Sequence, residues 1–242
     1  MVNDTQVLNN GYPMPSIGLG VYKITDEDME NVVNTAIETG YRAFDTAYFY
    51  GNEVALGKAL QNSGVDREDL FITSKLWNDY QGYDNTIEYF NQSLENLGLD
   101  YIDLFLIHWP CEKDGLYIES YKALEKLYDE GKVKAIGVCN FKQLHLEKLM
   151  EETEVVPQVN QIELHPYFNQ EDVQEFCDNH DIKVTAWMPL MRNRGLLDDS
   201  TIVDIAKRYD KTPAQVVLRW HLAHNRLIIP KTKTPERSKE NF

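Results

Sequence analysis

The chain has 242 residues, with 24 basic and 39 acidic side chains, so its formal net charge is −15. Hydrophobic residues make up 43% and charged residues 26%, ordinary values for a globular protein that exclude wholesale disorder. An acidic surface repels the phosphates of nucleic acids and anionic lipids, so we expect neither nucleic acid nor membrane as a partner.

The sequence gives no sign of export or of a metal centre. It has no run near the length of about 18 apolar residues that a membrane span needs, and its first twenty residues lack the pattern of a secretory signal. Cys111, Cys139 and Cys177 are odd in number and unpatterned, so they fit neither a disulfide framework nor a C-x-x-C site. We therefore expect a cytoplasmic protein without a metal.

The first pattern in the chain is a small hairpin, followed by a unit that repeats to the end. Segment 5–13 places Asn10-Gly11 between apolar runs, which predicts a β-hairpin. The repeating unit is a short β-branched run, a loop, an amphipathic helix and a glycine. In its first copy the apolar residues from Met29 recur at helical spacing, and Gly40 stands where a helix C-cap would.

Eight strand-like runs organise the chain. Runs such as 104–107 are continuously apolar, which is typical of parallel strands covered on both faces. Two helical patterns, 199–209 and 213–224, precede the last run. Eight strand–helix units favour a (β/α)₈ TIM barrel over an open doubly wound sheet, and we expect one domain spanning 1–242. The expected strands are 16–20, 42–44, 70–74, 103–107, 133–138, 158–162, 183–187 and 227–230.

A group of ionisable residues follows consecutive strands, at the end where TIM barrels build active sites. Asp45, Lys75 and His108 end three strands, and Tyr50 lies shortly after the aspartate. A tyrosine with its ordinary pKa of about 10 is a poor acid at neutral pH, and a nearby ammonium lowers that pKa. A neutral histidine can orient a carbonyl oxygen. The group therefore predicts a proton donor for an oxygen that gains negative charge.

Six motifs with these residues resemble those of the aldo-keto reductases, of the bacterial type. The order, spacing and barrel positions agree over residues 5–241. The motifs are GYRAFDTAYFYGNE (40–53), FITSKLW (71–77), LDYIDLFLIHWP (99–110), KVKAIGVCNF (132–141), VNQIELHPY (159–167) and IIPKTKTPERSKEN (228–241).

The resemblance implies an oxidoreductase that reduces aldehydes and ketones with NADPH, including α-keto or dicarbonyl compounds. It implies a catalytic tetrad of Asp45, Tyr50, Lys75 and His108, with Tyr50 as the general acid. The cofactor would lie across the barrel mouth without a Rossmann domain, and we expect a monomer. The expected substrate-binding residues are Tyr22, Tyr48, Trp77, His108 and Trp109.

The same resemblance assigns the cofactor contacts. The amides of Asn140 and Gln161 would hold the carboxamide, and Trp187 would stack on the nicotinamide ring. Lys231, Thr232 and Arg237 would bind the adenosine 2′-phosphate. The full set of expected cofactor residues is Gly20, Val21, Tyr22, Asn140, Gln161, Trp187, Leu190, Lys231, Thr232, Arg237, Glu240 and Asn241.

Three departures from the family pattern leave an alternative open. Cys139 stands in place of a serine, and Met188 replaces a small polar residue beside the pyrophosphate, where Arg192 and Arg194 could compensate. Family members continue past the position of Phe242 with a helix and a tail, so we expect broad selectivity and a marginally stable fold that NADPH stabilises. The alternative function is a non-catalytic or weakly active dinucleotide-binding relative.

Overall fold

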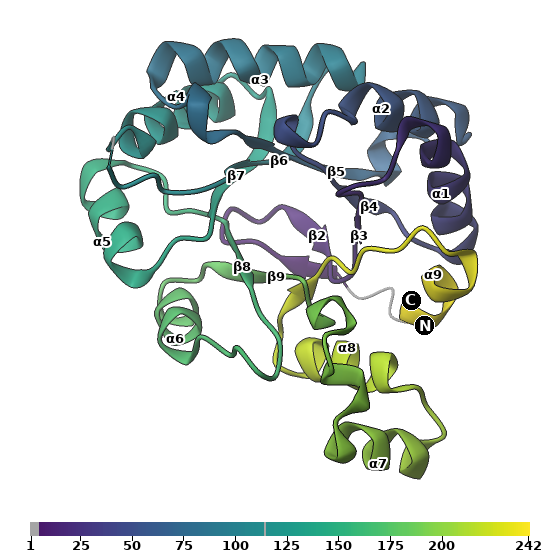
Figure 1. The fold of residues 1–242 in the computed structure, drawn as a ribbon. Helices are drawn as coiled ribbons and strands as arrows, with labels where there is room; N and C mark the ends of the chain where they lie inside the picture. Colours follow the sequence, from purple (N-terminus) through teal and green to yellow (C-terminus); the bar gives the residue numbers. More distant parts are fainter. Residues whose placement is uncertain (1–4, 114) are drawn as a thin grey trace.

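The computed structural model describes residues 5–113 and 115–242, in which eight parallel strands form one curled sheet with helices outside it (Figure 1). Each strand pairs with the next along the chain, so the sheet order follows the sequence. The strands are β3 (Leu19–Gly20), β4 (Ala43–Asp45), β5 (Phe71–Leu76), β6 (Ile102–Ile107), β7 (Val133–Cys139), β8 (Val159–Glu163), β9 (Lys183–Trp187) and β10 (Leu227–Ile228).

The sheet closes into a barrel between β10 and the segment that leads into β3. Ile17 and Ile228 form a parallel bridge, and the Gly18 amide donates to the Ile228 carbonyl over 2.8 Å. The Gly20 amide donates to the Pro230 carbonyl over 3.2 Å. The predicted (β/α)₈ barrel is therefore confirmed.

Amphipathic helices cover the outside of the barrel, and most of them bury their apolar faces against the strands, whereas α7 packs on α8 in a separate apolar cluster. Helix α1 shows how the sequence sets the boundaries. Thr25 accepts a hydrogen bond from the Asp28 amide at the start, and Gly40, at φ 123°, ends the helix by donating to the carbonyls of Ala36 and Ile37. The helices are α1 (Asp26–Thr39), α2 (Glu53–Asn62), α3 (Tyr83–Leu97), α4 (Tyr117–Asp129), α5 (Gln143–Glu152), α6 (Glu171–Asn179), α7 (Ser200–Tyr209), α8 (Pro213–Ala223) and α9 (Pro235–Asn241).

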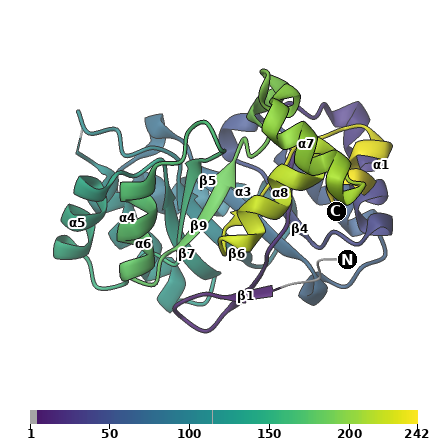
Figure 2. The ribbon, with the colours of Figure 1, turned by 90° about the horizontal axis from the view of Figure 1, so that it is seen from below.

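The predicted hairpin is present and plugs one end of the barrel. Strands β1 (Thr5–Val7) and β2 (Pro13–Pro15) pair antiparallel. Leu8 and Met14 are buried in the apolar cluster that fills the barrel interior and reaches Cys139 at the other end. Figure 2 shows the hairpin below the strands. The described part of the hairpin therefore closes the end of the barrel opposite to the carboxyl ends of the strands.

The last helix, α9, lies beside α1. The ring of Phe242, which follows α9, packs on the ring of Tyr41 with 4.7 Å between ring centroids. Among the described residues, none of the helices is both long enough and apolar enough to cross a bilayer.

Candidate active site

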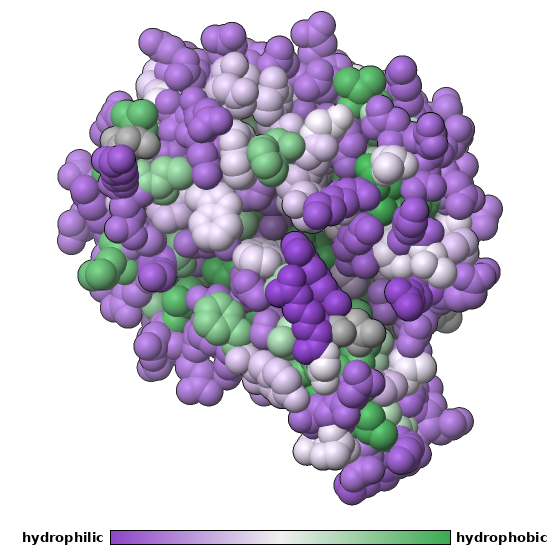
Figure 3. Space-filling model, viewed as in Figure 1, coloured by the Kyte–Doolittle hydropathy of each residue, from purple (hydrophilic) through white to green (hydrophobic). Residues whose placement is uncertain are grey.

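A cavity of about 810 Å³ opens at the carboxyl ends of the strands. On the face shown in Figure 3, hydrophilic side chains surround a central depression in which apolar groups are visible. Most of the residues proposed from the sequence meet around this one cavity. Those that line it are Gly20, Tyr22, Asp45, Tyr50, Trp77, His108, Trp109, Asn140, Gln161, Trp187, Leu190, Lys231, Thr232, Arg237, Glu240 and Asn241.

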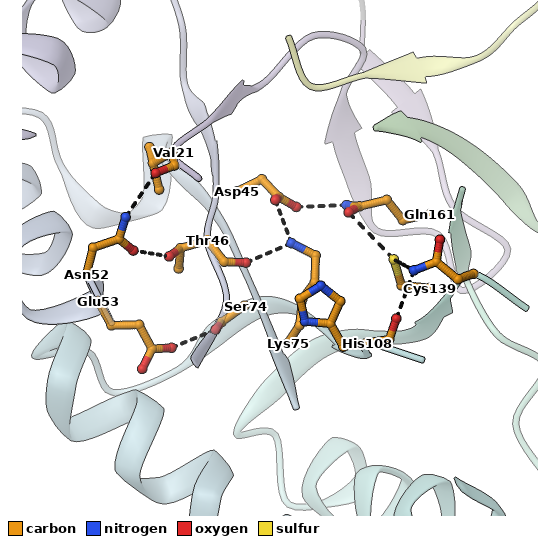
Figure 4. Close-up of polar contacts among 11 residues, drawn as sticks. Val21, Asp45, Thr46, Asn52, Glu53, Ser74, Lys75, His108, Cys139 and Gln161 are labelled. Atoms are coloured by element: carbon orange, nitrogen blue, oxygen red, sulfur yellow. Dashed lines mark hydrogen bonds and ion pairs between the residues drawn. The ribbon is translucent and has the colours of Figure 1, made fainter. Parts of the chain in front are cut away.

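A buried ion pair lies at the base of the cavity. The Lys75 Nζ, fully buried on β5, donates to Asp45 Oδ1 over 2.5 Å and to the Thr46 carbonyl over 2.8 Å (Figure 4). The Gln161 amide donates to the other carboxylate oxygen over 2.8 Å. Burial alone would lower the pKa of Lys75, but the Asp45 carboxylate, together with Tyr50 and Cys139, outweighs burial and raises that pKa. Lys75 is therefore an ammonium at neutral pH.

Tyr50 lies beside this ammonium, with 5.3 Å between the Lys75 Nζ and the centre of its ring. Burial raises the pKa of the Tyr50 phenol to about 12, although Lys75 acts to lower it. Sequence reasoning anticipated the lowering by lysine but not the larger opposing effect of burial, which no local pattern reveals. Without ligands the phenol is protonated, as a proton donor must be.

His108 follows β6 and completes the group. Burial, helped by the charge of Lys75, lowers the pKa of His108 to about 3, so its imidazole is neutral. Its ring meets those of Tyr50 and Trp77 edge to face, at centroid distances of 5.9 and 5.2 Å. A neutral imidazole can donate one hydrogen bond without bringing a competing charge.

Asn140 links the histidine to the opposite wall of the cavity. It adopts a left-handed backbone, at φ 65°, and its amide donates to the His108 carbonyl over 3.0 Å. Its side-chain oxygen accepts from the Trp187 indole over 2.8 Å. The Cys139 thiol lies 3.1 Å from the same amide nitrogen, and burial raises its pKa, so it stays an unreactive thiol.

Cations gather around the cavity of a protein that is otherwise acidic. Lys231, in the segment before α9, and Arg237, in the first turn of α9, line it, and so do Lys23 and Arg192. The Arg192 guanidinium lies 5.9 Å from the centre of the Tyr22 ring. Arg194, the other arginine considered from the sequence, is not among the lining residues. A groove with several cations suits an extended polyanionic ligand.

Two residues expected at the site lie outside the lining of the cavity, and one lining residue was not anticipated from the sequence. The Tyr48 hydroxyl donates to Gln92 of α3 over 2.6 Å, so Tyr48 faces away and is not a wall of the cavity. The Val21 side chain is buried in the core rather than in the lining. Phe49 instead enters the lining and stacks on Trp77, with 3.7 Å between ring centroids. The part of the chain that the structure describes contains no group of three or more His, Cys, Asp or Glu side chains that could hold a metal ion.

Comparison with known proteins identifies the class. The model of the aldo/keto reductase family matches residues 16–242. The chain is 48% identical over 238 residues to 9,11-endoperoxide prostaglandin H2 reductase of Trypanosoma cruzi, covering 97% of this chain and 83% of that protein. It is 46% identical over 244 residues to methylglyoxal reductase DkgA of Escherichia coli O157:H7, covering 100% and 88%.

Among solved structures, a mutant of Gox0644 in complex with NADPH matches with a TM-score of 0.95 at 44% identity, covering 100% of this chain and 87% of that one. The chain therefore belongs to the aldo/keto reductase family. The sequence-based prediction of an NADPH-dependent aldo-keto reductase is confirmed.

Proposed function

We propose that this protein reduces small aldehydes and dicarbonyl compounds to alcohols with NADPH, and that Tyr50 donates the proton. The observation that carries the proposal is the phenol held beside the buried Lys75–Asp45 pair, opposite a neutral His108, at the base of an open cavity. The similar E. coli protein is named a methylglyoxal reductase, which supports a dicarbonyl substrate.

The residues around the cavity fit NADPH. Lys231 and Arg237 offer positive charge for the adenosine 2′-phosphate, and Lys23 and Arg192 offer it for the pyrophosphate. Gly20 lines the same cavity and lets β3 pack closely on the segment after β10, because a Cβ there would lie 3.1 Å from the Ile229 carbonyl. The nicotinamide would contact Asn140, Gln161 and Trp187, which line the cavity near Tyr50 and His108. Thr232, Leu190, Glu240 and Asn241 complete the proposed cofactor site.

When bound, NADPH supplies the hydride, and the chain supplies the proton and the electrostatics. The neutral His108 imidazole donates a hydrogen bond to the carbonyl oxygen and orients it. Tyr50 passes its proton to that oxygen as negative charge develops there. Lys75 stabilises the phenolate that forms, and Asp45 holds the ammonium in place. This complete network argues against a purely dinucleotide-binding protein.

The wall of the substrate site is aromatic. Phe49, Trp77 and Trp109 line the mouth of the cavity, and Tyr22 lies 4.8 Å from Tyr50 between ring centroids. We expect this wall to favour carbonyl compounds with apolar or flat substituents.

Domain organisation, oligomeric state and localisation are also proposed. We propose that residues 1–242 act as one domain and as a monomer in the cytoplasm. The thiols of Cys139 and Cys177 are not in disulfides, which is common in a reducing compartment.

The decisive experiment measures the loss of NADPH absorbance with methylglyoxal, glyoxal and an aromatic aldehyde. Turnover with at least one of them is expected, and the Tyr50→Phe variant serves as the control for non-enzymatic oxidation. NADPH binding without turnover of any carbonyl compound would contradict the proposed function.

A further inference from the structure

We infer that Asn52 is a positioning residue for proton transfer: its side-chain amide ties the loop that carries Tyr50 to the loop that carries Tyr22. The inference rests on the proposed role of Tyr50. It concerns a residue that touches neither the cavity nor the ion pair, so it acts only through its neighbours.

Asn52 is buried, with 3% of its surface exposed, and its amide makes three hydrogen bonds, two of them to backbone atoms of another loop. Its nitrogen donates to the carbonyls of Val21 and Ile24 over 2.9 and 3.3 Å, and its oxygen accepts from the Thr46 hydroxyl over 2.8 Å. Figure 4 shows the contacts with Val21 and Thr46 at one end of the polar network that runs to Gln161. One side chain thus joins the ends of β3 and β4.

Asn52 occupies a helix N-cap position, but its side-chain amide bonds to other loops and not to its own helix. Asn52 is the N-cap residue of α2, where an asparagine side chain ordinarily accepts a hydrogen bond from its own helix. Here the side chain makes no capping hydrogen bond. Its hydrogen-bonding capacity is directed instead to the loops around the active site.

Two short connections carry the effect of Asn52 to the reacting groups. Only Gly51, in a left-handed conformation at φ 68°, separates it from Tyr50, so the backbone of the tyrosine is fixed by the same turn. On the other side, the carbonyl of Thr46 accepts from the Lys75 ammonium over 2.8 Å. Asn52 therefore sets where the phenol and the ammonium stand relative to each other.

The neighbouring residue makes the inference testable, because it holds α2 in place independently. Glu53 is buried and accepts from the Ser74 hydroxyl over 2.6 Å and from the Asn96 amide over 3.0 Å. Removing the Asn52 side chain therefore loosens the turn while the helix stays attached to β5 and α3.

The test compares Asn52→Ala with Gln158→Ala. Gln158 is an equally buried amide with three hydrogen bonds, to Ile136, Asn9 and Val156, but it precedes β8 at the opposite end of the barrel. Both variants should lower the melting temperature. Only Asn52→Ala should lower kcat, by about 10- to 100-fold, because small misplacements of reacting groups are costly. The dissociation constant for NADPH should change less than about threefold, since the phosphate contacts remain.

The pH profile of alcohol oxidation distinguishes a positioning role from a purely structural one, because loss of stability alone would not shift the profile. In the direction of alcohol oxidation, the rate rises with pH as Tyr50 ionises. In Asn52→Ala this rise should move to higher pH, because Lys75 no longer stands where it stabilises the phenolate. Thr46→Val, which removes only the hydroxyl bonded to Asn52, should give a smaller shift in the same direction. The pH shift in the double variant Thr46→Val/Asn52→Ala should be smaller than the sum of the shifts in the two single variants.

Two results overturn the inference: wild-type kcat and pH profile in folded Asn52→Ala, or an equal loss of kcat in Gln158→Ala. Should Asn52→Ala fail to fold, Thr46→Val decides in its place, and an unchanged pH profile in that variant overturns the inference. Tyr50→Phe, assayed in parallel, keeps the proposed function separate. If that variant keeps its kcat, the proposed function fails; if it is inactive while Asn52→Ala is unimpaired, only the positioning role fails.

Discussion

Replacing Lys75 with methionine tests two effects of the buried ammonium: stabilisation of the Tyr50 phenolate and charge pairing with Asp45. The Nζ lies 5.3 Å from the centre of the Tyr50 ring, and at an effective dielectric constant of about 20 a charge at that distance stabilises a phenolate by about 3 kcal/mol. That energy corresponds to a factor of about 10² in rate if the proton is largely transferred in the transition state. We therefore expect kcat of Lys75→Met to fall by about 10²–10⁴, with NADPH binding retained.

The same substitution leaves the Asp45 carboxylate buried, with Gln161 as its remaining side-chain partner. Breaking a buried pair from one side typically costs about 3–5 kcal/mol in the free energy of unfolding. The double variant Asp45→Asn/Lys75→Met should recover much of the lost stability but none of the activity.

Denaturant unfolding and single-turnover kinetics on the wild type and the two variants measure both effects. A Lys75→Met enzyme with most of its kcat would refute the electrostatic reasoning. A double variant as unstable as the single one would refute the explanation by an unpaired carboxylate.

Three further predictions follow from other parts of the site and the core. Arg237→Ala should weaken NADPH binding by about 10- to 100-fold and leave NADH binding nearly unchanged, which fluorescence titration with both cofactors measures; equal losses would contradict a 2′-phosphate contact. Burial lowers the pKa of His108 to about 3 and of His221 to about 4, so the unfolded chain binds more protons below pH 6.5 and the free energy of unfolding should fall there. His221→Gln should show a shallower decline in urea titrations between pH 7 and 4, and an unchanged slope would exclude this histidine as a cause. Phe49→Ala removes the ring stacked on Trp77, and the fold-increase in KM should be about ten times larger for aromatic aldehydes than for methylglyoxal. Equal fold-changes in KM would show that Phe49 does not contact the substrate.

The barrel and most of the site could be predicted from the sequence because both follow from strong, local signals. Continuous apolar runs such as 104–107 mark strands covered on both faces, and glycines such as Gly40 mark where helices end. The carboxyl ends of parallel strands meet at one end of a barrel. Asp45, Lys75 and His108 therefore had to converge once the strands were placed correctly.

What could not be predicted depends on directions and distances that no pattern encodes. Tyr48, Phe49 and Tyr50 form a single 3₁₀ turn, in which successive side chains point about 120° apart. Their aromatic character alone does not say that Tyr48 turns to Gln92 while Phe49 enters the cavity. Asn52 was missed because two of its partners, Val21 and Ile24, lie on a loop about 30 residues away in sequence.

The measurement that tests the central claim most directly is kcat of Tyr50→Phe together with its dissociation constant for NADPH. The substitution keeps the ring and removes only the hydroxyl. We expect turnover of methylglyoxal to fall by about 10²–10⁴ while NADPH binds as in the wild type, because the phenol acts in the transition state and not in cofactor binding. A variant that keeps most of its kcat would show that the proton comes from another group.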